Sequence, residues 1–226
     1  MPLDKYCAVI PAYNEGSHLS EVIRRLKDLM VPQNIIVVDD GSTDDTLAVA
    51  KAAGVTVIEH GRNRGKGLAL RSGFERAGKI RGVEAVLTLD ADGQHDPSEI
   101  LLFVERFERT GEDIIIGDRM SDTGKMPFIR KMTNMTTSLV ISLRAGRRIR
   151  DSQSGFRLIT TSILDRVELV TEHFETESEI LIKAAGKGAR FGSVPVSTIY
   201  SLEVSKINPW RDTARFIKLV FGSFFW

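Results

Sequence analysis

Short β-branched runs alternate with helical patterns over the first 117 residues, and this alternation limits the possible folds more than any other feature of the chain. The runs "YCAVI", "NIIVVD" and "VTVIEH" are typical of strands, and each is followed by a stretch with apolar residues at helical spacing. The patterns predict strands over 6–10, 34–39, 55–60, 84–89 and 113–117, and helices over 15–29, 43–54, 65–77 and 97–108. Such alternation predicts an α/β fold, in which helices on both faces flank a mostly parallel central sheet.

The chain beyond residue 117 is less regular, but it contains no signal of a second domain. The patterns predict helices over 126–144, over 175–187 and from about residue 210, and a strand over 189–196. The run "GFRLIT", at 155–160, is expected to be an edge strand. Because no repeat, low-complexity tract or Pro/Gly-rich linker separates the two halves, we expect residues 1–226 to form a single domain.

Composition and charge exclude several classes of protein. With 42% hydrophobic and 27% charged residues, the chain has the composition of a soluble globular protein, so wholesale disorder is not expected. The formal net charge of +1 gives no indication of a nucleic-acid partner. The single cysteine, Cys7, excludes an internal disulfide and is expected to be buried in a protein of a reducing compartment. We expect no signal peptide, and no uncharged apolar stretch approaches the roughly 18 residues that span a bilayer.

Polar motifs follow the carboxyl end of each of the first predicted strands. In chain order they are "PAYNEG", "DDGSTDDT", "GRNRGKG", "DADGQHD" and "DRM". Any one of them could be a solvated loop, since loops favour Asn, Asp and Gly. Open α/β sheets bind ligands outside the carboxyl ends of their strands, however, so the series predicts a ligand site along this edge.

Two of these motifs are suited to a nucleotide. Asp39 ends an apolar run, where a carboxylate costs desolvation unless a donor pairs with it, and a nucleobase or ribose is one such donor. The motif "GRNRGKG" offers close backbone approach through its glycines, with Lys66 or Arg62 as counter-charge for a diphosphate. A capped turn and a solvated basic turn are the alternatives. The spacing matches neither a P-loop nor a dinucleotide-binding fingerprint.

The stretch "TLDADGQHDP" predicts a divalent-metal site. In an extended chain Asp90 and Asp92 point to one side, with Ala91 opposite, and paired carboxylates suit Mg²⁺ or Mn²⁺ that also binds a substrate phosphate. Asp96 precedes a proline and is expected to cap a helix. No histidine shows the spacing of a metal ligand; His95 is near the metal, but no role is assigned to it.

With these motifs assembled, the sequence resembles the family 2 glycosyltransferases of the GT-A fold. The resemblance covers roughly residues 6–215, and the motifs that carry it, in the family's order, are "VIPAYNE", "VVDDGSTDDT", "NRGKGLALRSGF", "LDADGQHDP", "IIIGDR", "DSQSGFRL" and "ETESEILIKA". The chain is most similar to the branch that makes polyprenyl-phosphate sugars, such as dolichyl-phosphate mannose and glucose synthases. The segment "YSLEVSKINPWRDTARF" carries this narrower resemblance, because that branch has a similar segment near its acceptor site.

The resemblance implies roles for individual residues. The nucleotide would be bound by Pro11, Tyr13, Glu15, Asp39, Asp40, Arg64, Lys66, Asp90 and Ala91. The metal, Mg²⁺ or Mn²⁺, would be held by Asp90, Asp92 and Gln94. The acceptor phosphate would be bound by Arg119, Arg130, Ser205, Lys206 and Arg211. The catalytic residues would be Asp92, Arg119 and Arg130. Residues 1–117 would then form a nucleotide-binding half, 118–209 an acceptor-binding half and 210–226 a C-terminal amphipathic helix.

The implied reaction moves a hexose from a nucleotide-diphosphate sugar, GDP-mannose or UDP-glucose, to a polyprenyl or dolichyl phosphate. Because a phosphate monoester is already anionic and nucleophilic, this acceptor needs no general base, and we expect a metal-dependent displacement with inversion. Two alternatives stay open. A saccharide or glycolipid hydroxyl as acceptor would require a base, such as Glu177 or Glu179. A non-catalytic module that binds nucleotide sugars is the other.

The apolar C-terminal tail "RFIKLVFGSFFW" fits two arrangements. The helix packs on the domain, or it lies in the membrane interface with Phe216, Leu219, Val220, Phe224, Phe225 and Trp226 in the bilayer. A lipid-linked acceptor favours a peripheral protein at the cytoplasmic face of the membrane, and a membrane-protein partner subunit is also compatible with the resemblance. A purely cytoplasmic protein is the alternative.

Overall fold

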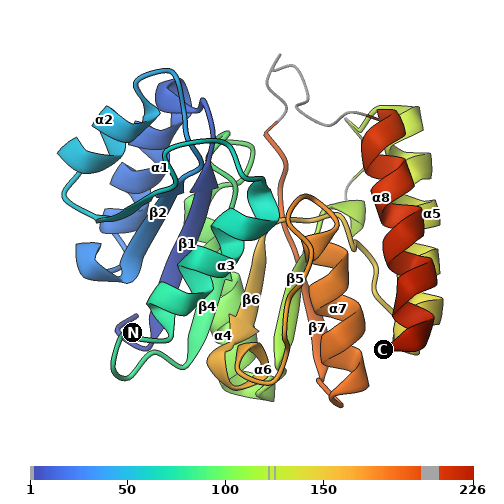
Figure 1. The fold of residues 1–226 in the computed structure, drawn as a ribbon. Coiled ribbons are helices and arrows are strands. Elements are labelled where there is room, and N and C mark those ends of the chain that lie inside the picture. Colours follow the sequence, from blue (N-terminus) through green and yellow to red (C-terminus); the bar gives the residue numbers. More distant parts are fainter. Residues whose placement is uncertain (1–2, 122, 125, 200–208) are drawn as a thin grey trace.

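The protein has a seven-stranded sheet between two layers of helices (Figure 1). The structure is a computed structural model that describes residues 3–121, 123–124, 126–199 and 209–226. The strands are β1 (Tyr6–Ala12), β2 (Ile35–Asp39), β3 (Thr56–Glu59), β4 (Ala85–Thr88), β5 (Ile114–Asp118), β6 (Arg157–Thr160) and β7 (Phe191–Pro195). Their order across the sheet is β3-β2-β1-β4-β6-β5-β7. The predicted α/β class is therefore confirmed.

All neighbouring strands pair in parallel except where β6 is involved. This strand pairs antiparallel with β4 on one side and with β5 on the other, and all four of its residues are buried. The prediction of an edge strand at 155–160 was therefore wrong, because both sides of β6 are hydrogen-bonded to neighbours. In this register Arg157 lies opposite Thr88 and Ile116, so the loop before β6 meets the carboxyl ends of β4 and β5.

Except for the short helix α6, which was not predicted, the helices agree with the predicted ranges to within a few residues. They are α1 (Gly16–Lys27), α2 (Thr46–Ala52), α3 (Lys66–Ala77), α4 (Ile100–Thr110), α5 (Phe128–Ala145), α6 (Thr161–Leu164), α7 (Thr176–Gly186) and α8 (Pro209–Gly222). Short 3₁₀ turns are η1 (Pro32–Asn34), η2 (Pro97–Glu99), η3 (Arg119–Ser121) and η4 (Ser223–Phe225). Asp96 accepts a hydrogen bond from the backbone N–H of Ser98 at the start of η2, as its position before a proline predicted.

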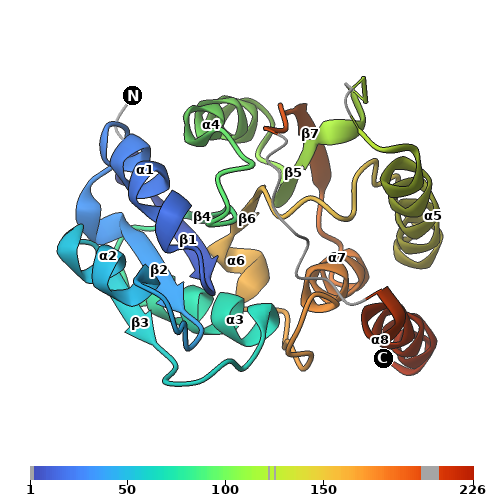
Figure 2. The same cartoon turned by 90° about the horizontal axis from the view of Figure 1, so that it is seen from above.

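Apolar helix faces cover the sheet on both sides (Figure 2). One face packs on α1 and α4, through residues such as Leu19 and Phe103, and the other packs on α3, α6 and α7, through residues such as Leu70 and Ile180. Cys7 of β1 is fully buried on the second of these faces, and its burial was predicted. Among the described residues no helix is both long and apolar enough to cross a membrane.

The two helices α5 and α8 lie at the end of the sheet beyond β7 (Figures 1 and 2). Arg144 of α5 hydrogen-bonds the hydroxyl of Ser223 just after α8, at 2.7 Å. The side chains of Phe216, Leu219 and Val220 face the domain, where Leu219 is buried and the other two pack against the core. Of the two arrangements left open by the sequence, packing on the domain therefore applies to these three residues, because the helical spacing turns them inward. The outward face of α8 and the tail expose Trp210, Ile217, Phe221, Phe224, Phe225 and Trp226.

Candidate active site

The predicted loops meet along one edge of the sheet and are hydrogen-bonded to one another. After β1, the backbone N–H of Asn14 donates to the Ser42 hydroxyl at 3.0 Å, and that of Glu15 donates to Thr46 at 2.8 Å. After β2, Asp40 reaches across to the loop that follows β3. The carboxyl ends of these strands thus form one continuous polar surface, as the sequence predicted from the position of the motifs.

Asp39, the last residue of β2, and Asp40, which follows it, differ in their surroundings. Asp40 is buried and accepts hydrogen bonds from His60 Nδ1 at 2.7 Å, from the Arg64 N–H at 3.0 Å and from the Gly65 N–H at 2.7 Å. It therefore holds the basic loop in place. Asp39 is also buried, and its Oδ2 accepts only a 3.3 Å bond from the Ser42 N–H. Its Oδ1 has no hydrogen-bond partner among the described residues, so this atom is available to a donor of a ligand.

The remaining residues predicted to bind the nucleotide lie around the end of β1 and on the basic loop. Pro11 and Tyr13 are half-buried, Arg64 is exposed, and Glu15 is buried at the start of α1. Glu15 is close enough to Asp92 to contribute to raising the pKa of that carboxyl. The loop after β1 and the loop after β4 therefore share one neighbourhood.

Lys66 lies between two carboxylates at the centre of this edge. Its ammonium, on the first residue of α3, is 2.7 Å from Asp90 Oδ1 and 3.2 Å from Glu177 Oε1 on α7. Burial alone would lower the pKa of Lys66, but the two carboxylates outweigh it and raise that pKa, so the ammonium is charged at neutral pH. The same interaction lowers the pKa of Asp90 against the effect of burial.

Asp92 forms no ion pair within the described part of the chain, and its backbone conformation differs from the predicted one. Residues 91–93 form a turn in place of the expected extended segment, because Gly93 adopts a left-handed φ of 70° and Ala91 is buried. The Asp92 carboxylate accepts the Gln94 N–H at 3.0 Å. Burial, followed by the charge of Asp90, raises the pKa of Asp92 to about 6. Two carboxylates therefore lie close together, and among the described residues Asp90 is the one in contact with a cation.

These residues fit a divalent metal that shares its coordination with a substrate. The chemistry of the set, two carboxylates and the Gln94 amide, suits Mg²⁺ or Mn²⁺. The contact of the Lys66 ammonium with Asp90 shows that this carboxylate already binds a positive charge. Nowhere in the described part of the chain do three or more His, Cys, Asp or Glu side chains gather as metal ligands. A metal held by these residues would take its remaining oxygen ligands from water or from a substrate phosphate.

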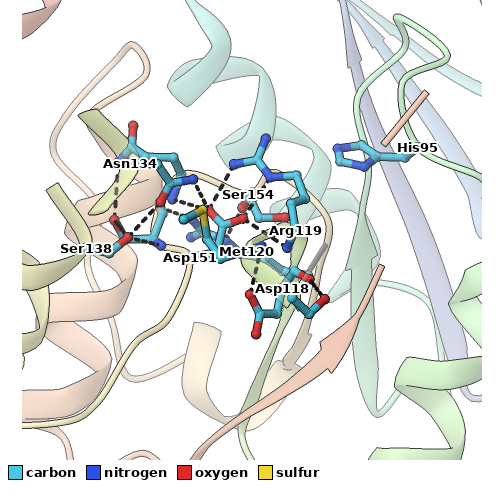
Figure 3. Close-up of polar contacts among 12 residues, drawn as sticks. His95, Asp118, Arg119, Met120, Asn134, Ser138, Asp151 and Ser154 are labelled. Atoms are coloured by element: carbon cyan, nitrogen blue, oxygen red, sulfur yellow. Dashed lines mark hydrogen bonds and ion pairs between the residues drawn. The ribbon is translucent and has the colours of Figure 1, made fainter. Parts of the chain in front are cut away.

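Arg119, which the sequence assigned to the acceptor, forms a buried pair that the sequence did not predict (Figure 3). Its guanidinium donates to both oxygens of Asp151, at 2.8 and 2.9 Å, and Asn134 of α5 donates to Asp151 at 2.7 Å. Burial would raise the pKa of Asp151, but Arg119 and Asn134 outweigh it and lower that pKa. The pair fixes the guanidinium at the end of β5, on the same side of the sheet as Asp90, whose charge it stabilises.

Two further buried residues were missed. Arg157 of β6 is fully buried and donates to three backbone carbonyls, those of Ser152, Ser154 and Glu177. It ties the loop before β6 to the first turn of α7. Its only signal in the sequence was a charged residue in an otherwise apolar run. Its partners among the described residues are backbone carbonyls, which every residue carries, so no acidic residue in the sequence indicated a partner for Arg157.

His95 is the other buried residue without an assigned role in the sequence. Its ring packs against that of Phe156 at a tilt of 47°, with 5.1 Å between ring centroids, and its Nε2 is 3.9 Å from Asp90 Oδ2. Burial lowers the pKa of His95 to about 4, so the ring is neutral at neutral pH. Its Nδ1 is buried without a hydrogen-bond partner among the described residues. The motif "DADGQHD" was the available signal, because it placed His95 within reach of the aspartates.

Glu177 and Glu179, the two predicted candidates for a general base, are both occupied. Glu179 is fully buried and accepts bonds from the N–H groups of Val170 and Thr171, and it pairs with Lys183 at 2.6 Å. It therefore braces the segment before α7 and does not face the site. Glu177 does face the site, but its carboxylate is paired with Lys66.

The remaining residues assigned to the acceptor are less central. Arg130 is exposed in the first turn of α5, and Arg211 is exposed on α8. Ser205 and Lys206 lie outside the described residues.

Comparisons with known proteins place the chain among sugar transferases. Residues 7–170 match the profile of a family described as Glycosyl transferase family 2. A UDP-N-acetylglucosamine–dolichyl-phosphate N-acetylglucosaminyltransferase of Methanococcus voltae is 32% identical over 85% of this chain and 85% of its own. A dolichol-phosphate mannosyltransferase of Pyrococcus furiosus is 34% identical over 84% of this chain and 55% of its own.

Solved structures agree on the fold. Glucosyl-3-phosphoglycerate synthase from Mycobacterium tuberculosis, in complex with Mn²⁺, uridine diphosphate and glucosyl-3-phosphoglycerate, superposes with a TM-score of 0.70. The match covers 97% of this chain and 78% of that chain at 19% identity. A mannosyl-3-phosphoglycerate synthase from Rubrobacter xylanophilus gives a TM-score of 0.71 over 97% of this chain and 72% of that chain, at 21% identity.

Proposed function

The chain belongs to glycosyl transferase family 2 and is a glycosyltransferase of the GT-A fold, and on that premise we propose that it transfers a hexose to a polyprenyl or dolichyl phosphate. The observation that carries the proposal is that, among the described residues, both predicted candidates for a general base are paired, whereas the acceptor side offers cations. Glu179 is locked in the protein and Glu177 is paired with Lys66, whereas Arg119 is held at the end of β5. A phosphate acceptor needs positive charge and no base, and the two relatives named for dolichyl phosphate support the same acceptor class.

The donor in this proposal is a nucleotide-diphosphate hexose bound along β1, β2 and the basic loop. GDP-mannose and UDP-glucose remain the expected donors, and the relative from Methanococcus voltae adds an N-acetylhexosamine to the panel. The unpartnered Oδ1 of Asp39 accepts a donor group of the nucleobase or ribose, next to Pro11, Tyr13 and Glu15. Asp40 acts indirectly, by holding the loop that carries Arg64 and Lys66.

We propose that Asp90, Asp92 and Gln94 hold a divalent metal, Mg²⁺ or Mn²⁺. When bound, the metal supplies a Lewis acid that neutralises charge on the departing diphosphate. The bound Mn²⁺ and uridine diphosphate of the mycobacterial synthase support a metal in a site of this fold. The chain's own contribution is the position of the two carboxylates, which the turn at Gly93 and the Asp92 bond to Gln94 fix.

The acceptor phosphate in this proposal is oriented by cations on the other side of the site. Arg119 is held in place by Asp151. The family resemblance assigns four further residues to the acceptor phosphate, namely Arg130, Arg211, Ser205 and Lys206. The phosphate oxygen attacks the anomeric carbon directly, in a single displacement that inverts its configuration. Neutralisation by these cations reduces the repulsion between two anionic substrates, which is the main obstacle to this reaction.

We also propose that the protein lies on the cytoplasmic face of a membrane, because its apolar exposed residues gather on α5 and α8. On α5 the exposed apolar side chains are Phe128, Ile129, Met132, Met135, Leu139 and Leu143. This helix carries three basic residues, Arg130, Lys131 and Arg144, and no acidic residue. Exposed apolar side chains next to basic ones suit an anionic lipid surface, although a membrane-protein subunit would cover the same face.

Lipid mass spectrometry tests the proposed reaction. The protein is incubated with Mg²⁺ or Mn²⁺, polyprenyl phosphate and a panel of nucleotide sugars, and NMR of the product reports its anomeric configuration. We expect a lipid-phosphate hexose of inverted configuration that disappears in Asp92→Ala. A product of retained configuration would exclude the single displacement, and a product that persists in Asp92→Ala would exclude the metal site.

A further inference from the structure

Three half-buried side chains from separate parts of the chain form a carboxylate–ammonium–carboxylate group in the donor site. The exposed fractions are 15% for Lys66, 28% for Asp90 and 13% for Glu177, so solvent screens their charges only weakly. Lys66 begins α3, Asp90 follows β4, and Glu177 lies in the first turn of α7. Among the described residues, the ammonium of Lys66 is the cation in direct contact with the proposed metal ligands.

The backbone brings the elements that carry these three side chains close together. The Leu68 N–H donates to the carbonyl of Glu172 at 3.1 Å, which ties the first turn of α3 to the segment before α7. A Cβ on Gly67 would lie 1.9 Å from the Thr176 hydroxyl, so only glycine allows the two elements to approach this closely. A Cβ on Gly155 would lie 2.7 Å from Asp90 Oδ2 and 3.1 Å from Lys66 Nζ. Backbone from three elements therefore surrounds the group.

We propose that Lys66 is an internal counter-ion that occupies Asp90 in the metal-free protein, and that Glu177 is the positioning residue that receives Lys66 when a divalent cation binds Asp90. Lys66 bridges two carboxylates, so it keeps one partner when it loses the other. The move leaves the ammonium inside the site, where it faces the diphosphate of the donor. This inference rests on the proposed function, because it takes Asp90 and Asp92 as the metal ligands.

The proposal predicts effects of opposite sign for its two residues. Removing the Lys66 charge frees Asp90 and tightens metal binding, whereas removing the Glu177 charge leaves Lys66 bound to Asp90 alone and weakens metal binding. A charge within about 4 to 6 Å changes the proton affinity of a carboxylate at least roughly tenfold, and we expect a change of about tenfold in metal affinity. A purely structural role for the group would weaken metal binding in both variants.

A Mn²⁺ titration without nucleotide or lipid, in which electron paramagnetic resonance measures free Mn²⁺, tests the proposal. We expect tighter binding in Lys66→Met and in Lys66→Gln, weaker binding in Glu177→Gln, and the Lys66→Met affinity in the double variant Lys66→Met/Glu177→Gln. The control is Lys51→Met, which removes a lysine that pairs with Glu59 on the surface at 3.0 Å and should leave the affinity unchanged. Thermal unfolding of each variant shows that it is folded.

Three results would overturn the proposal. These are a Lys66→Met affinity no tighter than that of the unmodified protein, a Lys51→Met effect as large as that of Lys66→Met, and a double variant that binds more weakly than Lys66→Met. The last would make Glu177 a direct ligand. Because the titration needs no sugar transfer, opposite shifts in a protein that makes no lipid product would support this inference and reject the proposed function. Lipid product together with unchanged Mn²⁺ affinities would support the proposed function and reject this inference.

Discussion

Replacing Asp92 by asparagine should make the metal-free protein more stable at pH 7, although it removes a proposed metal ligand. The change deletes the charge but keeps the shape of the side chain and the oxygen that accepts the Gln94 N–H. Asp92 is ionised at pH 7 in a place where burial and the neighbouring Asp90 carboxylate oppose its charge. The native state therefore bears an electrostatic cost at this residue, and asparagine removes it.

The size of the effect follows from the pKa of Asp92, which is raised from 3.8 to about 6. One pKa unit corresponds to about 1.4 kcal/mol, so the free energy of unfolding should rise by about 1 to 3 kcal/mol in Asp92→Asn, with the upper value for a fully retained charge. A carboxyl whose pKa is higher in the folded state destabilises the protein as the pH rises from about 4 to about 6. The difference between Asp92→Asn and the unmodified protein should therefore be largest above pH 6 and shrink as the pH falls toward 4.

Urea unfolding of the metal-free protein at pH 7, 6 and 5, in the presence of a chelator, measures the difference directly. Asp96→Asn is the matched control, because this loop aspartate is paired with Arg25 and accepts the Ser98 N–H, which lower its pKa against the effect of burial. Its replacement should destabilise the protein at pH 7. An Asp92→Asn variant that is no more stable than the unmodified protein at pH 7, or a difference that does not change with pH, would refute the reasoning.

Three other changes have clear expected outcomes. Asp151→Ala leaves the half-buried Arg119 guanidinium without its fully buried partner and should lower the free energy of unfolding by about 2 to 4 kcal/mol in urea titrations; a loss under 1 kcal/mol would contradict a stabilising pair. Glu179→Gln should cost about 1 to 3 kcal/mol of stability but leave the kcat of the folded protein near its original value. A lost kcat with unchanged stability would instead identify a base. Phe221→Gln should reduce flotation with anionic liposomes, whereas the equally drastic Leu101→Gln on α4 should not; equal flotation of both would remove the membrane face.

The sequence predicted the parts of the fold that depend on local patterns. Strands β1 to β5 and the helices between them follow from β-branched runs, helical spacing and Asp96 before its proline, all of which act within a few residues. The insertion of β6 between β4 and β5 was missed, because a four-residue buried run carries no information on which strands it joins. The inward face of α8 could not be assigned either, since its partner surface is formed by distant elements.

In the candidate site, too, the sequence indicated the residues in local motifs but not the contacts between distant segments. Asp90, Asp92 and Lys66 were selected as candidates because each lies in a polar motif directly after a strand, and the structure places Lys66 in contact with Asp90. The pairing of Arg119 with Asp151 and the buried Arg157 depend on the antiparallel entry of β6, which brings the loop before it to the ligand edge. No local pattern records such a contact. The turn at Gly93 was missed for a different reason, because alternating aspartates fit an extended chain as well as a turn.

The acceptor class is the central claim, and a competition between two lipids tests it most directly. The protein receives Mg²⁺ or Mn²⁺, a nucleotide sugar on which it turns over, and equal amounts of polyprenyl phosphate and the unphosphorylated polyprenol of the same length, with a soluble saccharide also present. Mass spectrometry then identifies which acceptor carries the sugar. The account predicts a hexose on the polyprenyl phosphate alone. Sugar on the polyprenol or the saccharide, with the phosphate lipid unmodified, would contradict it.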